Sequence, residues 1–285
     1  MTFSIVACDP KTKDLGVAVE SKFPAVGAAV PWAQAGVGAV ATQSWANTTY
    51  GPRGLAMLKR GMTPSQVVKA LTAKDRERQK RQVGVVDSRG RVASFTGKEC
   101  HGWAGHLVGK HYACQGNLLA SGDVVKAMAL AFERTAGDLP AKLLSALVAG
   151  QDAGGDRRGQ QSATLLVVRE KGGYAGFNDR WIDLRVDDHP RPIEELIRVF
   201  HIWDITMLTR EDPKNVVEIT HDVAAFIQRF LARIGSYDGP VNGRWDAKSR
   251  EALESWMGVE NLENKVRTDG KLWGSVWRYI REKAG

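Results

Sequence analysis

Residues 2–23 read TFSIVACDPKTKDLGVAVESKF, and this stretch decides how the chain is expected to fold. An apolar run from Phe3 to Cys8 is followed by a polar segment at residues 9–14 and a second apolar run from Leu15 to Val19. Two short apolar runs joined by a turn rich in Asp, Pro and Lys are typical of adjacent buried strands. Residues 26–30 and 37–43 repeat the pattern with Gly, Ala and Val, so we expect a meander of strands.

Helical patterns then alternate with further strand patterns. Thr63 is a good N-cap and Pro64 a good first residue for a helix over residues 64–73, which follows a helix over residues 53–60. The remaining helices are expected at residues 123–134, 140–148 and 193–208. The remaining strands are expected at residues 83–86, 91–96, 111–115, 162–169 and 173–186, the last with an interruption near residues 178–179. Since helices come in consecutive pairs between groups of antiparallel strands, the sequence predicts an α+β protein of packed layers.

A polar stretch with a proline, TREDPKNV at residues 209–216, predicts a linker between a domain at residues 1–208 and a small module at residues 217–285. Apolar residues recur at helical spacing around Phe226 and Phe230, and further helices are expected near residues 247–257 and 272–281. We therefore expect an all-helical module whose tryptophans serve its own core first, because so small a domain needs large apolar side chains.

The composition is that of an ordinary folded protein, since 43% of the 285 residues are hydrophobic and 25% are charged. No apolar stretch approaches the roughly 20 residues that a membrane-spanning helix needs. The N-terminal segment carries Asp9, Asp14 and Glu20 instead of a secretion-signal pattern, and the chain has only three cysteines. We therefore expect no membrane partner, no disulfide framework and a cytoplasmic location.

The net charge of +8 arises from 40 basic and 32 acidic residues that are mixed along most of the chain. The densest basic run, KDRERQKR at residues 74–81, also contains two acids and no aromatic residue. Nucleic-acid-binding surfaces usually belong to a recognition module or interleave cations with aromatic residues. We interpret the run as a solvated helix end and expect no nucleic-acid partner.

Thr2 has the chemistry of a nucleophile when it becomes the first residue. Met1 precedes a small side chain, the circumstance in which an initiator methionine is usually removed. The freed α-amino group has a reference pKa of about 7.7–8.0, so near neutral pH it can take the proton of the threonine hydroxyl. One residue would then supply both nucleophile and base.

The segment at residues 2–23 resembles the opening of the N-terminal-nucleophile (Ntn) hydrolases of the proteasome type. In that family a threonine heads one strand and an acid-Ser-basic triplet follows the next strand; here the triplet is Glu20, Ser21 and Lys22. The resemblance implies that Glu20 and Lys22 orient Thr2 and tune its amine, with Ser21 at the substrate.

The resemblance continues in two later segments. Gln115, Gly116 and Asn117 correspond to a glycine-rich turn whose backbone N–H groups help the nucleophile, and Asp156 corresponds to an aspartate before a strand. Two features of the proteasome type are absent: residues 25–29, AVGAA, contain no lysine, and residues 157–161, RRGQQ, replace a Ser-Gly pair.

Residues 1–208 as a whole are similar to an uncharacterised bacterial family of unknown function with an Ntn-hydrolase-like fold. The phrases that carry this resemblance are MTFSIVA, GVAVESKF, AVGAAVPWAQAGVGAVATQ, YGPRGL, QGNLLA and GGDRRGQQSA. It implies a four-layer α-β-β-α sandwich. Residues 217–285 are similar to a peptidoglycan-binding-like module, with the signature IGSYDGPVNGRWDAKSREAL.

Two arginines, Arg157 and Arg158, follow Asp156 in a glycine-rich loop. Guanidinium groups suit the clamping of a carboxylate, whereas a plain surface loop with Asp156 paired to an arginine is the alternative. Gln43, at the head of the stretch QSWANTTY, is expected to line the same cleft with its amide, and ordinary loop chemistry explains that stretch equally well.

Several potential metal ligands crowd one segment, namely Cys100, His101, His106, His111 and Cys114. Their spacing fits no standard zinc knuckle. Buried thiols and hydrogen-bonded histidines that pack a strand and a loop are the commoner outcome, so we expect no metal and no cofactor.

Two functions of different classes follow. The first is an amidohydrolase that acts on a small amide or peptide through an acyl-enzyme on Thr2, with oxyanion donors near Gly116 and Asn117. The second is a noncatalytic Ntn-fold binding or scaffold protein for an anionic metabolite or glycan fragment. For the C-terminal module we favour assembly into a homo-oligomer over binding of a glycan or peptidoglycan fragment.

Overall fold

Strand β1 (Thr2–Cys8) lies in the middle of a six-stranded antiparallel sheet. The computed structural model describes residues 2–285, and in it β1 pairs with β2 (Leu15–Ser21) on one side and β8 (Tyr112–Leu119) on the other. Strands β9 (Ser162–Val168), β10 (Arg180–Val186) and β7 (Trp103–Gly109) complete the order β10-β9-β2-β1-β8-β7. All residues of β1 and β2 are buried, which explains why both are nearly continuous apolar runs.

A second antiparallel sheet, of four strands, packs face to face with the first. It consists of β3 (Pro31–Gln34), β4 (Gly38–Ser44), β5 (Arg81–Asp87) and β6 (Val92–Thr96) in sequential order. Strand β1 contacts β4, and β5 contacts β8, so the two sheets bury an apolar cluster between them. The chain is therefore an α+β protein with antiparallel sheets, as predicted.

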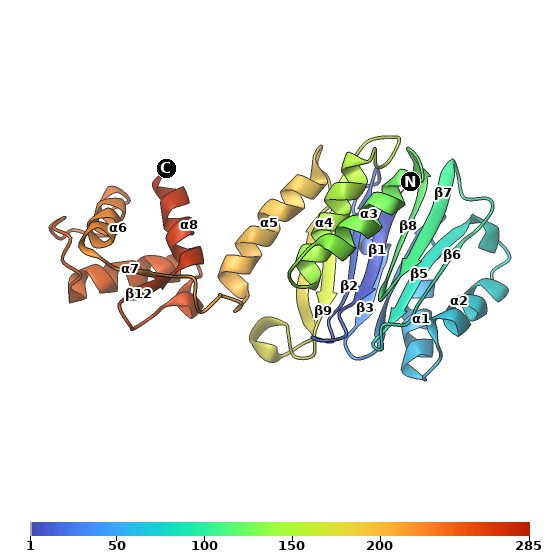
Figure 1. Ribbon diagram of the computed structural model, residues 1–285, viewed down its shortest axis with the longest axis horizontal. Coiled ribbons are helices and arrows are strands. Elements are labelled where there is room, and N and C mark those ends of the chain that lie inside the picture. The colour runs from blue at the N-terminus through green and yellow to red at the C-terminus, as the bar shows by residue number, and fades with distance from the viewer. Residues whose placement is uncertain (1) are drawn as a thin grey trace. The chain divides into compact units, whose positions relative to one another are not determined.

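Helices cover the outer face of each sheet (Figure 1). Helices α3 (Asp123–Arg134) and α4 (Leu139–Asp152) pack on β8, β1 and β2, whereas α1 (Tyr50–Lys59) and α2 (Pro64–Ala73) pack on β4, β5 and β6. The bounds of α2 are as predicted because Thr63 and Gln66 form a capping box and Pro64 occupies the first turn.

Alternation along β1 decides which side chains reach the space between the sheets. Phe3 faces α4, since a Cβ built on Gly150 would lie 3.1 Å from the Phe3 ring. Val6 and Cys8 belong to the cluster between the sheets, and Thr2 shares their face because successive side chains point to opposite sides. The Thr2 hydroxyl thus points toward the second sheet, and not toward the helices.

Four predictions about the first unit are wrong. The strand expected over residues 173–186 begins only at Arg180, in β10, and Tyr174–Gly176 form a 3₁₀ helix, η3. Residues 26–30 are no strand: Val26–Ala28 form a 3₁₀ helix, η1, after Ala25 in the left-handed region at φ 49°. Strand β7 was missed because its exposed edge position leaves a mixed pattern of His, Gly and apolar residues. Strand β8 extends through the expected glycine-rich turn to Leu119, and His111 lies in the preceding turn at φ 70°.

The chain divides into two compact units, one ending at Val199 and the other running from Phe200 to Gly285. The division falls inside helix α5 (Pro192–Met207). Buried Lys265 donates to the carbonyl of Leu208 and to Glu211, and the Gly274 N–H donates to the carbonyl of Asn215 at 2.8 Å. Residues 209–216, predicted as a linker, are therefore held by the second unit.

The second unit contains α6 (His221–Arg233), α7 (Ala247–Val259) and α8 (Gly274–Ala284) around an apolar core. Trp256 is buried in that core, and Trp245, Trp273 and Trp277 pack against it. The prediction of an all-helical module is wrong, because β11 (Val216–Glu218) pairs with β12 (Lys271–Trp273). Within residues 2–285, no helix is both long and apolar enough to span a bilayer.

Candidate active site

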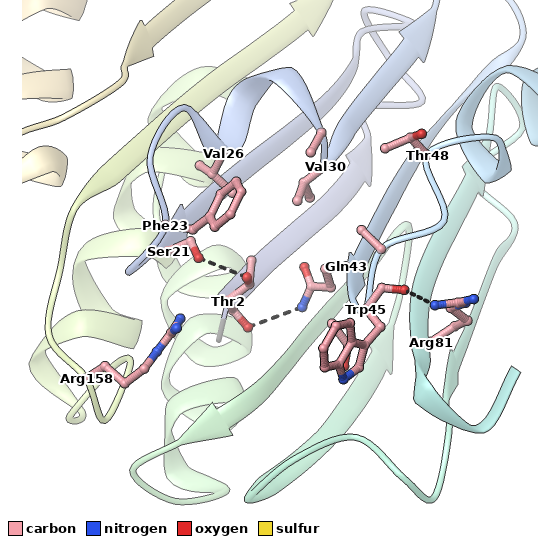
Figure 2. Close-up of a pocket in the computed structure, with 13 residues that line it drawn as sticks. Thr2, Ser21, Phe23, Val26, Val30, Gln43, Trp45, Thr48, Arg81 and Arg158 are labelled. Atoms are coloured by element: carbon pink, nitrogen blue, oxygen red, sulfur yellow. Dashed lines mark hydrogen bonds between the residues drawn. The ribbon is translucent and has the colours of Figure 1, made fainter. Parts of the chain in front are cut away.

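Thr2 lies in the wall of a pocket of about 380 Å³ between the two sheets (Figure 2). The pocket is built from the head of β1, the end of β2, the segment around η1 and the loop after β4. The residues that line it are Thr2, Ser21, Phe23, Val26, Ala29, Val30, Gln43, Ser44, Trp45, Ala46, Thr48, Arg81 and Arg158. Four of the predicted site residues are among them: Thr2, Ser21, Gln43 and Arg158.

The Thr2 side chain is held at the floor of this pocket. Its Oγ1 shares a hydrogen bond of 3.0 Å with the Ser21 hydroxyl, and its carbonyl accepts a bond of 3.2 Å from Gln43 Nε2. Both residues line the pocket although each is largely buried. The head of β1 is therefore fixed from both sheets, with the threonine oxygen at the surface that a ligand would meet.

Gln43 belongs to a buried amide network that joins the sheets. Its Nε2 donates to Gln82 Oε1 at 2.8 Å, which also accepts from Asn117 Nδ2 at 3.0 Å. Gln82 Nε2 in turn donates to the Gly116 carbonyl at 2.8 Å. Gln82 was missed by sequence reasoning, and its only signal was a glutamine inside the apolar strand RQVGVVD. The network fixes the position of Gln43, and through it the backbone of Thr2.

Glu20 lies behind the strand and outside the pocket. It pairs with Phe3 across the ladder, so its side chain is on the sheet face opposite to the Thr2 hydroxyl. The residue is 0% exposed, and neither carboxyl oxygen has a hydrogen-bond partner among residues 2–285. Burial, together with the nearby Asp156 carboxylate, raises the pKa of Glu20 from 4.5 to about 9, so this carboxyl is protonated at neutral pH.

Asp156 ties the segment after β2 to the loop before β9. It accepts from the Lys22 N–H at 3.0 Å, from the Arg158 N–H at 2.8 Å and from the Arg158 guanidinium at 3.3 Å. Asp156 is buried, whereas the Arg158 side chain is 46% exposed and extends to the pocket. Asp156 thereby sets where the Arg158 guanidinium lies.

The structure does not bring Lys22 and Arg157 to the pocket. Lys22 is exposed, and its Nζ donates to the carbonyl of Gln160 at 3.2 Å. Arg157 is exposed too, with its backbone N–H on the Leu118 carbonyl at 3.3 Å. Both residues lie where the backbone turns, just after β2 and just after Asp156, and their neighbours Ser21 and Arg158 line the pocket instead.

Gln115, Gly116 and Asn117 are strand residues, not a turn. Asn117 pairs with Thr2 and with Ala104, and Gly116 with Phe3 and Gly105, so β1 and β7 flank both positions. Backbone groups of a central strand are used by its two neighbours. None of the three residues is among those that line the pocket. The structure thus gives their backbone N–H groups to the sheet, away from a reacting carbonyl.

The candidate metal ligands are dispersed. Each of three has a hydrogen-bond partner of its own. Cys100 Sγ donates to the Arg81 carbonyl at 3.4 Å, His106 Nδ1 is hydrogen-bonded to Thr96 Oγ1 at 2.8 Å, and His111 Nδ1 is hydrogen-bonded to the Gly90 carbonyl at 3.1 Å. Burial raises the pKa of the fully enclosed Cys114 thiol. Across the described residues 2–285, no three His, Cys, Asp or Glu side chains form a group that could hold a metal ion.

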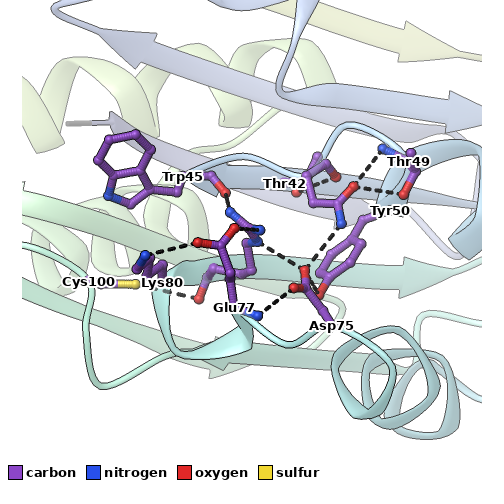
Figure 3. A network of polar contacts seen from close by, with 10 residues as sticks. Thr42, Trp45, Thr49, Tyr50, Asp75, Glu77, Lys80 and Cys100 are labelled. Carbon is purple, nitrogen blue, oxygen red and sulfur yellow. Dashed lines mark hydrogen bonds and ion pairs between the residues drawn. The ribbon is translucent and has the colours of Figure 1, made fainter.

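The wall opposite η1 depends on a polar cluster that sequence reasoning did not assign to the site (Figure 3). Arg81 donates to the Trp45 carbonyl at 2.6 Å, to Asp75 at 2.9 Å and to Glu77 at 2.8 Å. Asp75 also accepts from Asn47 and Tyr50. Burial alone would raise the pKa of Asp75, but the hydrogen bonds from Arg81, Asn47 and its other donors hold it well below its usual range. The basic run at residues 74–81 is therefore part of the support for the pocket wall.

The polar side chains that line the pocket carry hydroxyl, amide and guanidinium groups. Among its lining residues the charged side chains are Arg81, neutralised by Asp75 and Glu77, and Arg158. No lysine, histidine or carboxylate of the described chain is part of the lining. A base for the Thr2 hydroxyl would therefore have to come from Thr2 itself or from a ligand.

The model of the family of unknown function DUF1028 matches residues 2–196, which hold every residue of this pocket. The chain belongs to that family. A crystal structure of a DUF1028 protein from Silicibacter pomeroyi has 31% sequence identity and a TM-score of 0.66, covering 71% of this chain and 86% of that one. The ancestral β-subunit Anbu of Yersinia bercovieri is matched at 12% identity and a TM-score of 0.32, over 74% of this chain and 100% of that one.

The segment that follows the DUF1028 unit matches the model of a second family. The model described as "Putative peptidoglycan binding domain" matches residues 206–280, which lie in the second unit. No curated protein matches the chain. The family resemblance stated from the sequence is thus confirmed for both parts, while the DUF1028 family itself carries no assigned activity.

Proposed function

We propose that the DUF1028 unit is an Ntn-type amidohydrolase that cleaves a small amide or peptide through an acyl-enzyme on Thr2. The observation that carries this proposal is the position of the Thr2 hydroxyl, at the head of a central strand and in the wall of the pocket between two sheets. Two face-to-face antiparallel sheets with a helix pair on each outer face support an Ntn-hydrolase-like sandwich.

The reaction needs Thr2 to be the first residue. Removal of Met1, which lies outside the described residues, frees an α-amine that takes the hydroxyl proton while Oγ1 attacks the amide carbon. The C–N bond then breaks, the proton passes to the leaving amine, and water hydrolyses the ester to release the acid. The Ser21 hydroxyl, 3.0 Å from Oγ1, is proposed as the positioning group for the nucleophile.

Glu20 and Asp156 are proposed to act on the amine side of Thr2. Glu20 stands opposite Phe3, next to the head of β1, in a fully buried position where no group of residues 2–285 is hydrogen-bonded to its carboxyl oxygens. A buried carboxyl without a partner is costly unless it is neutral or meets a cation. An α-ammonium on Thr2 would supply that cation, which makes Glu20 its proposed counter-charge.

The test is the turnover of amide substrates by the full-length chain with and without Met1. We expect Thr2→Ala to remove turnover and Thr2→Ser to keep part of it, while a chain with a blocked or extended N-terminus behaves like Thr2→Ala. Undiminished turnover by Thr2→Ala or by the blocked chain contradicts the proposal.

A noncatalytic binding protein for an anionic metabolite is the second candidate. It is favoured by the absence of any lysine, histidine or carboxylate among the pocket-lining residues of the described chain. In that case the pocket binds an anion with the same affinity whether Met1 is present or removed, and no substrate is turned over.

For the second unit, the family match supports a proposed role in binding peptidoglycan or its fragments. Assembly into a homo-oligomer, which we favoured from the sequence, stays a prediction. Binding of purified sacculi and light scattering of the full-length chain separate the two roles.

A further inference from the structure

Two exposed aromatic rings stand on either side of Thr2 in the pocket. Phe23 is 53% exposed and Trp45 is 57% exposed, and both line the pocket. Figure 2 shows them on opposite sides of the Thr2 side chain, with Val26 beside Phe23. Large exposed aromatics gathered around a concave site are typical of ligand-binding surfaces.

The backbone under Trp45 is fixed from behind. Its carbonyl accepts from Arg81 at 2.6 Å, its N–H donates to the Lys80 carbonyl at 3.3 Å, and its indole N–H donates to His101 Nε2 at 3.1 Å. Arg81 is itself held by Asp75, which is linked to Asn47 of the same loop. An ordered cluster of this kind positions the exposed ring before any ligand arrives.

The backbone around Phe23 is held by residues at the start of β9 and just after β10. Ser162 donates its hydroxyl to the Phe23 carbonyl at 2.5 Å and accepts from the Val26 N–H at 3.0 Å. The Ala25 N–H donates to the Asp187 carbonyl at 2.8 Å. Both exposed rings therefore lie on segments whose backbone is held in place by buried side chains or by backbone groups.

The charge of the pocket selects the ligand further. The Arg158 guanidinium enters from a third side, near Thr2 and Phe23 in Figure 2. Its partner Asp156 is buried behind the loop and is not part of the lining. The lining residues of the described chain include no carboxylate, so a carboxylate on the ligand would share the Arg158 guanidinium with Asp156, which lies 3.3 Å from it and outside the lining.

We propose that the pocket accepts an N-acyl amino acid whose free carboxylate pairs with Arg158 and whose flat acyl group lies between Phe23 and Trp45. A volume of about 380 Å³ is suited to a small molecule of this kind. The inference rests on the proposed function for the bond that is cleaved: the acyl group is transferred to Thr2 Oγ1, the amino acid leaves with the hydroxyl proton, and water then releases the acid.

Binding is tested separately from cleavage by calorimetric titration of the full-length Thr2→Ala chain. The probes are N-benzoyl-L-alanine, N-benzoyl-L-alaninamide, which lacks the carboxylate, and N-acetyl-L-alanine, which lacks the ring. We expect the benzoyl acid to bind at least tenfold more tightly than either of the others. Equal affinity for the acid and its amide, or for the benzoyl and acetyl compounds, overturns the proposal.

Matched variants assign each preference to its residue. Arg158→Gln should abolish the preference for the acid over the amide, whereas Arg157→Gln, outside the lining, should keep it. Trp45→Ala should abolish the preference for the benzoyl compound, and Phe177→Ala, which truncates an 89% exposed ring elsewhere, should keep it. Preferences that survive Arg158→Gln and Trp45→Ala contradict the inference.

The two proposals fail in different ways. Selective binding by Thr2→Ala without turnover by the Met1-free chain removes the hydrolase proposal and leaves the ligand class standing. Turnover of amides without either preference keeps the hydrolase and removes the ligand class.

Discussion

Replacement of Glu20 by glutamine is expected to stabilise the protein at neutral pH. The pKa of Glu20 is raised to about 9 in the folded state from 4.5, because the carboxyl is buried beside Asp156. Folding then takes up a proton wherever Glu20 is ionised in the unfolded chain but neutral in the folded one. The free energy of unfolding therefore falls as pH rises between about 4.5 and about 9, and stability is greatest at the acidic end.

The size of the effect follows from the pKa values. Each pH unit in that window costs about 1.4 kcal/mol, so at pH 7 the penalty is on the order of 3 kcal/mol. Glu20→Gln keeps the shape and cannot ionise, so its gain over the wild type should be near zero at pH 4 and on the order of 3 kcal/mol at pH 7. Urea denaturation followed by far-UV circular dichroism at several pH values measures this difference.

Exposed Glu170 offers a matched control, since Glu170→Gln should leave the pH dependence as in the wild type. Removal of Met1 should reduce the penalty at Glu20, because the proposed Thr2 ammonium would pair with the carboxylate. A Glu20→Gln chain with wild-type stability at both pH 4 and pH 8 would refute the reasoning, because it would mean that the carboxyl is solvated or already paired.

Three other predictions concern the support of the pocket and the second unit. Asp75→Asn should lower the free energy of unfolding by about 1.5–3 kcal/mol at pH 7, because charge-assisted hydrogen bonds to the carboxylate are lost. Since the pKa of Asp75 is lowered in the folded state, this stabilisation is present above about pH 4 and disappears on acidification. Thermal melts of the wild type and the variant at pH 7 and pH 3 measure the difference. Gln82→Leu should lower stability by about 1–3 kcal/mol, because Asn117 Nδ2 loses its acceptor and Gln43 Nε2 keeps only the carbonyls of Thr2 and Gln115. Hydrogen exchange in β1 and β8 should accelerate, and unchanged exchange counts against the network. Trp245→Ala, at a small groove of the second unit, should weaken binding to purified sacculi several-fold in sedimentation assays while light scattering stays the same; a change in particle mass alone would favour assembly instead.

The elements of this chain were predictable where local patterns are strong. The apolar runs of β1 and β2 reflect burial on both faces, and the capping box at Thr63 set the start of α2. The segment Val26–Ala28 was not predictable, since Gly, Ala and Val fit a strand as well as a 3₁₀ turn. Tertiary contacts determine the conformation of this segment, since Gly27 packs so closely against Thr164 that no larger side chain would fit at that position.

The sequence predicted which residue types belong to the candidate site better than it predicted which way their side chains point. The sequence predicted that Glu20 and Lys22 orient Thr2, but the ladder register puts Glu20 on the sheet face opposite to the Thr2 hydroxyl. Lys22 points to solvent, and Gly116 and Asn117 belong to a strand because β7, unseen in the sequence, pairs with them. Arg81, which lies far along the chain from Trp45, donates a hydrogen bond to the Trp45 carbonyl beside the pocket. A local sequence pattern cannot predict a contact of this kind.

Intact-mass spectrometry tests most directly whether Thr2 with a free amine is the nucleophile. The full-length chain is prepared with and without Met1, incubated with the activated ester p-nitrophenyl benzoate, and the labelled position is located by peptide mapping, with Thr2→Ala as the control. We expect one benzoyl group on Thr2 of the Met1-free chain and none at residue 2 of the other two chains. Equal labelling of all three chains contradicts this expectation, and so does a Met1-free chain that neither carries a benzoyl ester on Thr2 nor releases benzoate faster than Thr2→Ala.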